Sequence, residues 1–233
     1  MQYPSSACLL QAWEFAASER PVRRPLSWLS SAFGWSRSDL ENLSLGERDR
    51  LILQARCLLF GTKMTGLVEC KACNEQVECE IPVRALLDVP RVSNSMVSIE
   101  GEGFQVDVRM ITAGDVEAVS NTPDCRELLF RRCVIHGSWP ETQAESVIQV
   151  AGERLADADP LANISIDLVC PNCSASFAPT FDPWKFLWDE LEIWARRVLQ
   201  QVHFLASAYG WTEDQVLSLS ASRRALYLQL VKR

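Results

Sequence analysis

Cys70-Lys71-Ala72-Cys73 and Cys170-Pro171-Asn172-Cys173 are two CxxC turns that stand 100 positions apart in a chain of 233 residues. The residues that follow each turn repeat at the same offset, with Val77 aligned to Phe177, Ile81 to Phe181, Leu86 to Phe186 and Leu87 to Leu187. Each copy predicts an apolar strand, the CxxC turn, a second strand and a short helical start. The repeat therefore indicates two halves of one metal-binding ribbon.

Ligand chemistry explains why two halves are needed. One CxxC turn offers two thiolates, whereas a structural zinc site is closed by four tetrahedral ligands. The two turns together supply that set, Cys70, Cys73, Cys170 and Cys173. We expect a structural Zn²⁺ ion, with iron as the other metal that four thiolates suit. Two chance turns with buried thiols are the plainer alternative. A redox CxxC would need an oxidoreductase-like βαβ context, and two copies in matching frames argue against it.

The position after each second cysteine departs from the commonest ribbon pattern. Many knuckles place glycine there because the backbone turns left-handed, but this chain has Asn74 and Ser174. Asparagine tolerates that conformation better than serine does.

Composition bounds the class of protein. The chain is 48% hydrophobic, which is enough for a substantial core. No apolar run approaches the ~20 residues of a membrane span, and no basic segment followed by an apolar stretch opens the chain, so we expect a protein made in the cytoplasm. The other cysteines are scattered and odd in number, which fits reduced thiols: Cys8, Cys57, Cys79, Cys125 and Cys133.

Charge is distributed unevenly. Residues 74–169 contain 17 acidic and 7 basic side chains, whereas the rest of the chain sums to +3. Binding to nucleic-acid phosphates needs clustered Lys and Arg, so the acidic middle favours a protein partner. A zinc-ribbon adaptor for nucleic acid is the alternative.

Capping and periodicity place helices over residues 6–18, 36–43, 45–60, 112–119, 123–134, 141–156, 183–209, 212–219 and from 220 onward, and a hairpin over 97–109. The stretch from Pro21 to Pro25 is expected only to end the first helix. We predict a mainly helical α+β fold with a split four-cysteine zinc ribbon. Its segments are an N-terminal helical region (1–65), the first ribbon half (66–87), an acidic α+β insert (88–163), the second ribbon half (164–182) and a C-terminal helical region (183–233).

A second repeat joins the two ends of the chain. Gly210-Trp211-Thr212, followed by Val216, Leu219 and Arg224, matches Gly34-Trp35-Ser36, followed by Leu40, Leu43 and Arg48, at an offset of 176. This match predicts related helical pairs at the two ends.

The last helix is our candidate partner surface. Arg223 and Arg224 stand beside Tyr227, and arginine and tyrosine dominate interface hot spots. We expect both arginines to be exposed, and the apolar residues to face the long helix, namely Val216, Leu217, Leu226 and Leu230.

Catalytic patterns are absent from the sequence. It contains no GxSxG or HExxH motif, and the only histidines, His136 and His203, stand near no other candidate catalytic group. We therefore expect a protein that is not an enzyme, and a hydrolase that uses either histidine with an open metal site is the remote alternative.

Several short motifs occur in an order that resembles a known family. The order comprises residues 45–50 (LGERDR), 59–61 (LFG), the first CxxC, 158–160 (ADP), the second CxxC, 186–191 (FLWDEL), 203–206 (HFLA), 209–211 (YGW), 223–224 (RR) and 227–228 (YL). It is similar to a family encoded beside tail genes of contractile phages and of phage-like extracellular injection systems. Members of that family look related to the baseplate hub assembly chaperones of T-even-type phages. The resemblance covers about residues 40–233.

The resemblance implies a non-enzymatic structural or assembly protein of a contractile tail. Its implied partner is the baseplate hub, spike or tape-measure protein, without nucleic acid or membrane insertion. It implies a cytoplasmic location during assembly and leaves open whether the chain stays in the finished particle.

Overall fold

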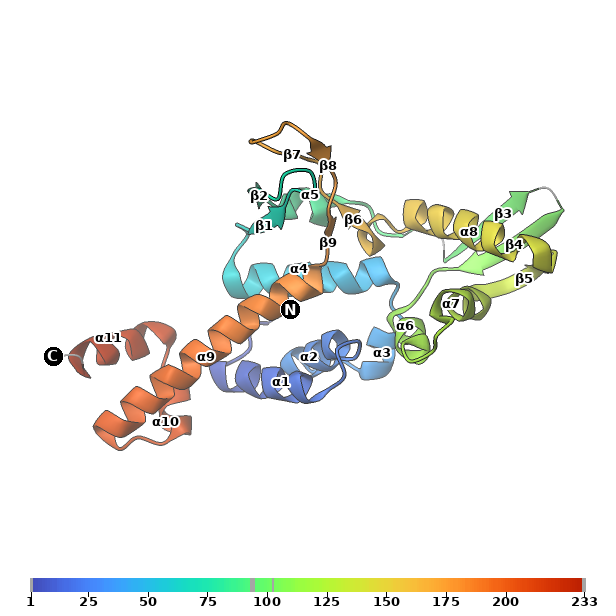
Figure 1. Ribbon diagram of the computed structural model, residues 1–233. Helices are drawn as coiled ribbons and strands as arrows, with labels where there is room; N and C mark the ends of the chain where they lie inside the picture. The colour runs from blue at the N-terminus through green and yellow to red at the C-terminus, as the bar shows by residue number, and fades with distance from the viewer. Residues whose placement is uncertain (1, 93–94, 102, 232–233) are drawn as a thin grey trace. The chain divides into compact units, whose positions relative to one another are not determined.

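The computed structural model describes residues 2–92, 95–101 and 103–231. It divides the chain into two compact units: unit 1 is Met1–Arg37 with Trp184–Arg233, and unit 2 is Ser38–Pro183. Helices account for 57% of the chain and small sheets for 16%, which confirms the mainly helical α+β fold. The two units regroup the expected segments, because the first 37 residues join the C-terminal helices (Figure 1).

Unit 1 is helical in its described part. Its helices are α1 (Ser6–Ser18), α2 (Arg24–Phe33), α9 (Pro183–Tyr209), α10 (Glu213–Leu217) and α11 (Ala221–Val231). The predicted caps are present: Ser5 accepts a hydrogen bond from the Cys8 amide, and Thr212 and Gln215 form a capping box on α10. The helical boundaries at 6–18 and 183–209 are confirmed.

The core of unit 1 lies where α1, α9 and α10 meet. Leu10 of α1 packs against Ala195 and Val198 of α9 and against Leu217 of α10. Along α9 an inward stripe recurs at a helical period, with Leu187, Leu191, Ala195, Val198 and Leu205 all buried. Burying each leucine or valine of this stripe contributes roughly 1.5–3 kcal/mol to stability.

Helix α2 was not predicted from the sequence. Pro25 occupies its first turn, where a missing N–H costs nothing, so the proline favours the start of a helix. Leu26, Trp28 and Leu29 of α2 are at most 1% exposed.

Unit 2 contains α3 (Arg37–Glu41), α4 (Leu45–Phe60), the two ribbon halves and the insert. The ribbon strands are β1 (Thr65–Glu69), β2 (Gln76–Glu80), β6 (Ile164–Ser165), β7 (Leu168–Val169), β8 (Ser176–Phe177) and β9 (Thr180–Phe181), and α5 (Val83–Asp88) follows β2. The single second-half strand expected before Cys170 is divided into β6 and β7. Ile166 between them donates its amide hydrogen to the Pro179 carbonyl, which lies opposite.

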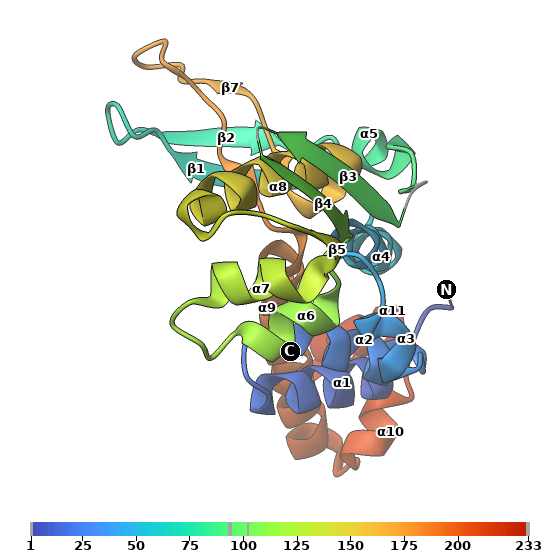
Figure 2. The same ribbon diagram turned by 90° about the vertical axis from the view of Figure 1, so that its right-hand side faces the viewer.

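The insert is a three-stranded antiparallel sheet covered by helices. Its elements are β3 (Met96–Gly101), β4 (Phe104–Arg109), α6 (Ala113–Val119), α7 (Cys125–Cys133), β5 (Val134–Ser138), η1 (Glu141–Gln143), α8 (Ala144–Ala158) and η2 (Pro160–Ala162), with strand order β3-β4-β5. Helix α8 lies along the sheet (Figure 2), and Val147 and Ala151 on it pack with Ile99 and Val106 on the strands. The hairpin and the three helices were predicted.

Strand β5 was missed, because the sequence suggested that the preceding helix continues to residue 134. Gly137 shows why the chain becomes a strand here. Its φ is +124°, and a Cβ at this position would collide with the backbone of Gln105 and Val106 on β4. This close approach, which only glycine permits, is a tertiary requirement that local periodicity does not reveal.

A buried carboxylate, Asp115, joins a strand and a helix within the insert. Arg109 at the end of β4 donates two hydrogen bonds to Asp115 of α6, at 2.5 and 2.9 Å. Burial alone would raise the pKa of Asp115, but the bonds from Arg109 and Thr112 outweigh it and hold that pKa well below its usual range. The carboxylate thus stays charged and ties β4 to the α6 capping box.

A second buried carboxylate fastens the insert to α4. The amide of Gly46 in the first turn of α4 donates to Asp159 Oδ2 at 2.9 Å, across 113 positions of sequence. An acidic group at a helix N-terminus is stabilised by the free amides and by the helix dipole. Gly46 allows this approach, because a Cβ there would overlap the Asp159 carboxylate.

Two glycine substitutions test this contact. Gly46→Ala forces Asp159 away from the amides of α4 and should destabilise unit 2 by about 1–3 kcal/mol. Gly152→Ala, in the middle of α8, is the control: its Cβ would meet nothing within 4 Å, so better helix propensity should stabilise the protein by about 0.5–1 kcal/mol. Thermal unfolding midpoints that fall for both variants, or for neither, would contradict the assignment.

Candidate metal centre

Four sulfur atoms converge where the two knuckles of unit 2 meet. Cys70 Sγ lies 3.8 Å from Cys173 Sγ, and Cys73 Sγ lies 3.6 Å from Cys170 Sγ. All four sulfurs fall within 4.8 Å of one another. A tetrahedron of thiolates around an ion at about 2.3 Å has edges of about 3.8 Å. The four cysteines therefore form a site that can hold a metal ion, as the two CxxC turns predicted.

The two knuckles share one backbone conformation. In the first, the Cys70 amide donates to the Glu75 carbonyl at 2.9 Å and the Asn74 amide donates to the Cys70 carbonyl at 2.7 Å. In the second, Cys170 and Ser174 make the equivalent bonds, to Ala175 and Cys170, at 3.0 and 2.9 Å.

The residue after each knuckle is left-handed, as the sequence suggested. Asn74 has φ of 60° and Ser174 has φ of 59°. A non-glycine residue in this region carries a conformational cost. The chain accepts that cost twice, at the two positions where the turn directs the sulfurs inward.

The strands that hold the knuckles also repeat. Val68 pairs with Val77 across β1 and β2, and the residues 100 positions later, Leu168 and Phe177, pair across β7 and β8. Figures 1 and 2 show the two hairpins side by side. Val77 packs with Cys70 and Cys170 in one small cluster, so the sulfurs sit on an apolar base.

Backbone amides act directly on the thiols. The amides of Cys173 and Asn172 donate to Cys170 Sγ, and they lower the pKa of the Cys170 thiol to about 7. The Ala175 amide lowers the pKa of Cys173, but its three sulfur neighbours outweigh that effect and raise the pKa to about 12. A negative charge on one sulfur thus disfavours deprotonation of the neighbouring thiol. Four thiolates at these distances need a cation between them.

These amide donors could not be identified from the sequence. Every residue except proline carries an N–H group, and only the folded turn aims the groups of Asn172, Cys173 and Ala175 at sulfur.

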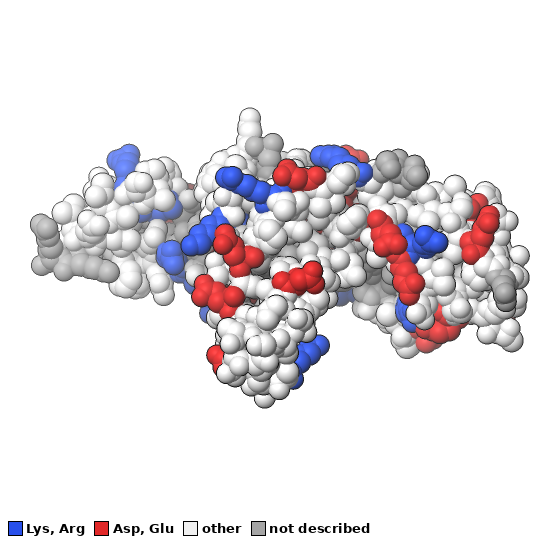
Figure 3. All heavy atoms as spheres, turned by 90° about the horizontal axis from the view of Figure 1, so that it is seen from above, with Lys and Arg blue, Asp and Glu red and all other residues white. Residues whose placement is uncertain are grey.

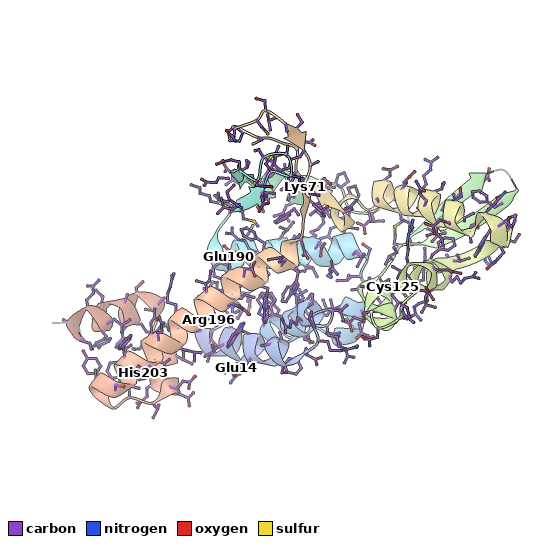
Figure 4. All side chains as sticks on the ribbon, viewed as in Figure 1. Glu14, Lys71, Cys125, Glu190, Arg196 and His203 are labelled. Atoms are coloured by element: carbon purple, nitrogen blue, oxygen red, sulfur yellow. The ribbon has the colours of Figure 1, made fainter. Side chains whose placement is uncertain are left out.

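The site is closed on one side and open to solvent on the other. Cys70 and Cys170 are each 1% exposed, whereas Cys173 is exposed. Lys71 stands at the tip of the first knuckle (Figure 4). Acidic and basic side chains are interspersed over the face shown in Figure 3. The first hairpin exposes one basic residue, Lys71, and several acidic ones, Glu69, Glu75, Glu78 and Glu80. Four cysteine ligands leave no coordination position for substrate, so the arrangement suits a structural ion.

The histidines lie outside this site. His136 is exposed on β5, and His203 is exposed on α9 (Figure 4). Among the described residues, the four cysteines are the group of Cys, His, Asp and Glu side chains whose ligand atoms converge.

Comparison of the chain with protein-family profiles, curated proteins and solved structures returns no match. Within the described residues, no helix has both the length and the apolar character needed to cross a membrane.

The structure corrects the expected exposure of the C-terminal surface. Arg223 is exposed, but Arg224 is only 2% exposed. The Arg224 guanidinium donates to the Leu219 carbonyl at 2.6 Å, to Gln201 Oε1 at 3.0 Å and to Ser6 Oγ at 3.2 Å. The expectation of two exposed arginines is therefore wrong for Arg224, which fastens α11 to α9 and α1.

Tyr227 is half-buried, with its ring 4.9 Å from that of Trp211 and 5.8 Å from that of Tyr209. Val216 and Leu217 are buried as predicted. Leu226 and Leu230, which were expected to face inward, are exposed. The inward side of α11 is thus formed by Arg224, Tyr227 and Leu228, and not by Leu226 and Leu230.

Substituting the two adjacent arginines one at a time distinguishes their contributions to stability. Arg224→Ala leaves the Leu219 carbonyl and Gln201 without a buried partner and should destabilise unit 1 by roughly 2–4 kcal/mol. Arg223→Ala should change stability by less than about 0.5 kcal/mol, because that side chain is exposed. Urea denaturation of both variants measures the difference, and equal midpoints would show that the Arg224 bonds contribute nothing.

Proposed function

We propose that the chain is a non-enzymatic structural or assembly protein, and that a zinc ion at the four-cysteine centre acts as its structural staple. The observation that carries this proposal is the convergence of Cys70 and Cys73 with Cys170 and Cys173 in a closed four-sulfur set. A centre with four protein ligands holds chain segments together and offers no site for catalysis. Zinc fits because it prefers a tetrahedron of thiolates and has no redox chemistry that exposure of Cys173 would disturb.

Removing ligands tests the metal. Protein purified without chelators should contain one equivalent of zinc per chain by elemental analysis. Cys70→Ser combined with Cys170→Ser removes one ligand from each knuckle and should reduce zinc to below about a tenth of an equivalent. Cys125→Ser, at an exposed cysteine outside the site, should keep the full equivalent. Iron in place of zinc, or no metal in the unsubstituted protein, would overturn the zinc assignment.

The class of assembly that we propose is the baseplate of a contractile phage tail or phage-like injection system, with the hub, spike or tape-measure protein as partner. The resemblance of residues 40–233 to the family encoded beside such tail genes supports it. The surface around the metal centre supports protein contact over nucleic-acid contact. Loops 70–75 and 170–175 together carry only one basic side chain, Lys71, whereas a nucleic-acid ribbon needs several near the phosphates.

Genetic complementation tests this class. Deletion of the gene should leave producing cells without contractile particles that carry complete baseplates, as seen by electron microscopy. Expression of the Cys125→Ser variant should restore them, and the Cys70→Ser, Cys170→Ser variant should not, because its knuckles are no longer joined. Normal particles after deletion would refute the baseplate role. Salt-sensitive retention of the protein on DNA would instead favour the nucleic-acid adaptor.

A further inference from the structure

The structure extends the repeat between the two ends of the chain. Phe33 and Trp35 stack with ring centroids 5.2 Å apart around Gly34, whose φ is +69°. At the offset of 176, Tyr209 and Trp211 stack at 4.7 Å around Gly210, whose φ is +67°. Each motif ends one helix, α2 or α9, and is followed by a short helix, α3 or α10.

The helices that follow also correspond. Ser44 accepts a hydrogen bond from the third amide beyond it at the start of α4, and Ser220 does the same at the start of α11. Arg48 of α4 aligns with Arg224 of α11. Helix α11 is therefore the structural counterpart of α4.

The two counterparts differ in what covers them. In α4, Ile52, Leu53 and Ala55 are at most 1% exposed. Arg50 of α4 is 5% exposed, because its guanidinium donates to the carbonyls of Leu87 and Val89 at 2.6 and 2.7 Å. The end of α5 and the residue that follows it thus cover the Arg50 side of α4. At the offset of 176, Ile52 and Ala55 align with Leu228 and Val231 of α11, which are half-buried.

The corresponding face of α11 is left uncovered by the described residues. Leu226, which aligns with Arg50, is 60% exposed, and Leu230, one turn later, is 58% exposed. Arg224 is the buried residue among the described positions of α11. Tyr227, Leu228 and Val231 are half-buried on the inner side of α11. Leu226 and Leu230, at i and i+4, form a second apolar stripe that faces solvent.

Charge indicates what kind of chain fits this face. Unit 1 contains 11 Lys and Arg residues against 7 Asp and Glu residues, although the whole chain has a net charge of −7. Arg223, exposed and on the same side of the helix as Leu226 and Leu230 by helical periodicity, gives the stripe a basic border. Such a surface favours an acidic partner that brings apolar side chains.

We propose that the outer face of α11, formed by Arg223, Leu226 and Leu230, is the docking site for an acidic, apolar-bearing segment of another protein. That segment covers α11 as residues 87–89 cover α4, with apolar contacts to Leu226 where the first copy uses the Arg50 hydrogen bonds. Arg224, on the inner side of α11, holds the helix in place through its hydrogen bonds to α9 and α1. This inference specifies the chemistry of the partner in the proposed function and rests on that function for its setting.

Photo-crosslinking in the producing cell tests the site and identifies the partner in one experiment. Benzoylphenylalanine is incorporated in place of Leu226, and in a matched control in place of Ile193, an apolar residue of α9 that is 61% exposed. Mass spectrometry identifies the crosslinked peptide. We expect a peptide of another protein with more acidic than basic residues, obtained from position 226 and not from position 193.

Substitutions test whether the charge of Arg223 and the apolar contact of Leu230 produce the crosslink. Arg223→Glu and, separately, Leu230→Asp should each lower the crosslink yield at position 226 by at least about tenfold, whereas Ile193→Asp should not. Circular dichroism confirms that each variant is folded. A crosslink to a second copy of this chain, a crosslink to a neutral or basic peptide, a yield insensitive to Arg223→Glu, or no crosslink above the control would each overturn the proposal.

The docking site and the proposed function fail separately. If particles form with complete baseplates in cells that carry Leu226→Asp with Leu230→Asp but not in cells that lack the gene, only the docking site is wrong. If deletion of the gene has no effect on particles, the baseplate role is wrong, and the charge of the crosslinked peptide still decides whether the α11 face binds an acidic segment.

Discussion

Four sulfur atoms that all lie within 4.8 Å of one another join the two ribbon halves of unit 2. Closing a loop of about 100 residues costs about 4–5 kcal/mol of chain entropy, and the two knuckles span such a loop. The apparent binding free energy of a structural zinc ion is about 10–16 kcal/mol. A bound ion can therefore offset both the loop closure and the left-handed strain at Asn74 and Ser174.

Polar contacts, like the metal centre, join segments of unit 2 that are distant in the sequence. Gly46 and Asp159 join α4 to the end of the insert, and Arg50 joins α4 to the end of α5 and to Val89 after it. Each contact spans tens of residues and uses a buried charged group, and the hydrogen bonds reduce the cost of burying its charge. Directional bonds thus hold the acidic insert and the ribbon to α4, and these bonds fix which surfaces of unit 2 face outward.

The C-terminal helices of unit 1 repeat features of the segment α2–α3–α4, but the described residues leave the outer leucines of α11 exposed. The α9–α10–α11 segment reproduces the aromatic-Gly-Trp turn, the short helix and the serine-capped last helix of α2–α3–α4. The first copy continues into the ribbon and α5, whose end and following residue cover the Arg50 side of α4, whereas no described residue covers the outer leucines of α11.

The sequence by itself determined the elements whose signals are local. CxxC spacing and the 100-residue repeat predicted the four ligands and the strand pairs around them, and the capping residues Ser5, Ser44, Thr112 and Thr212 placed helix starts correctly, because a cap needs only neighbours within one turn. Tertiary structure decided what depends on contacts across the chain. Strand β5 forms because Gly137 lies against β4, and Arg224 is buried because Gln201 and Ser6 lie within reach of its guanidinium. Periodicity assigns a leucine to the inside and an arginine to the outside, and on α11 the packing of α9 and α1 reverses both assignments.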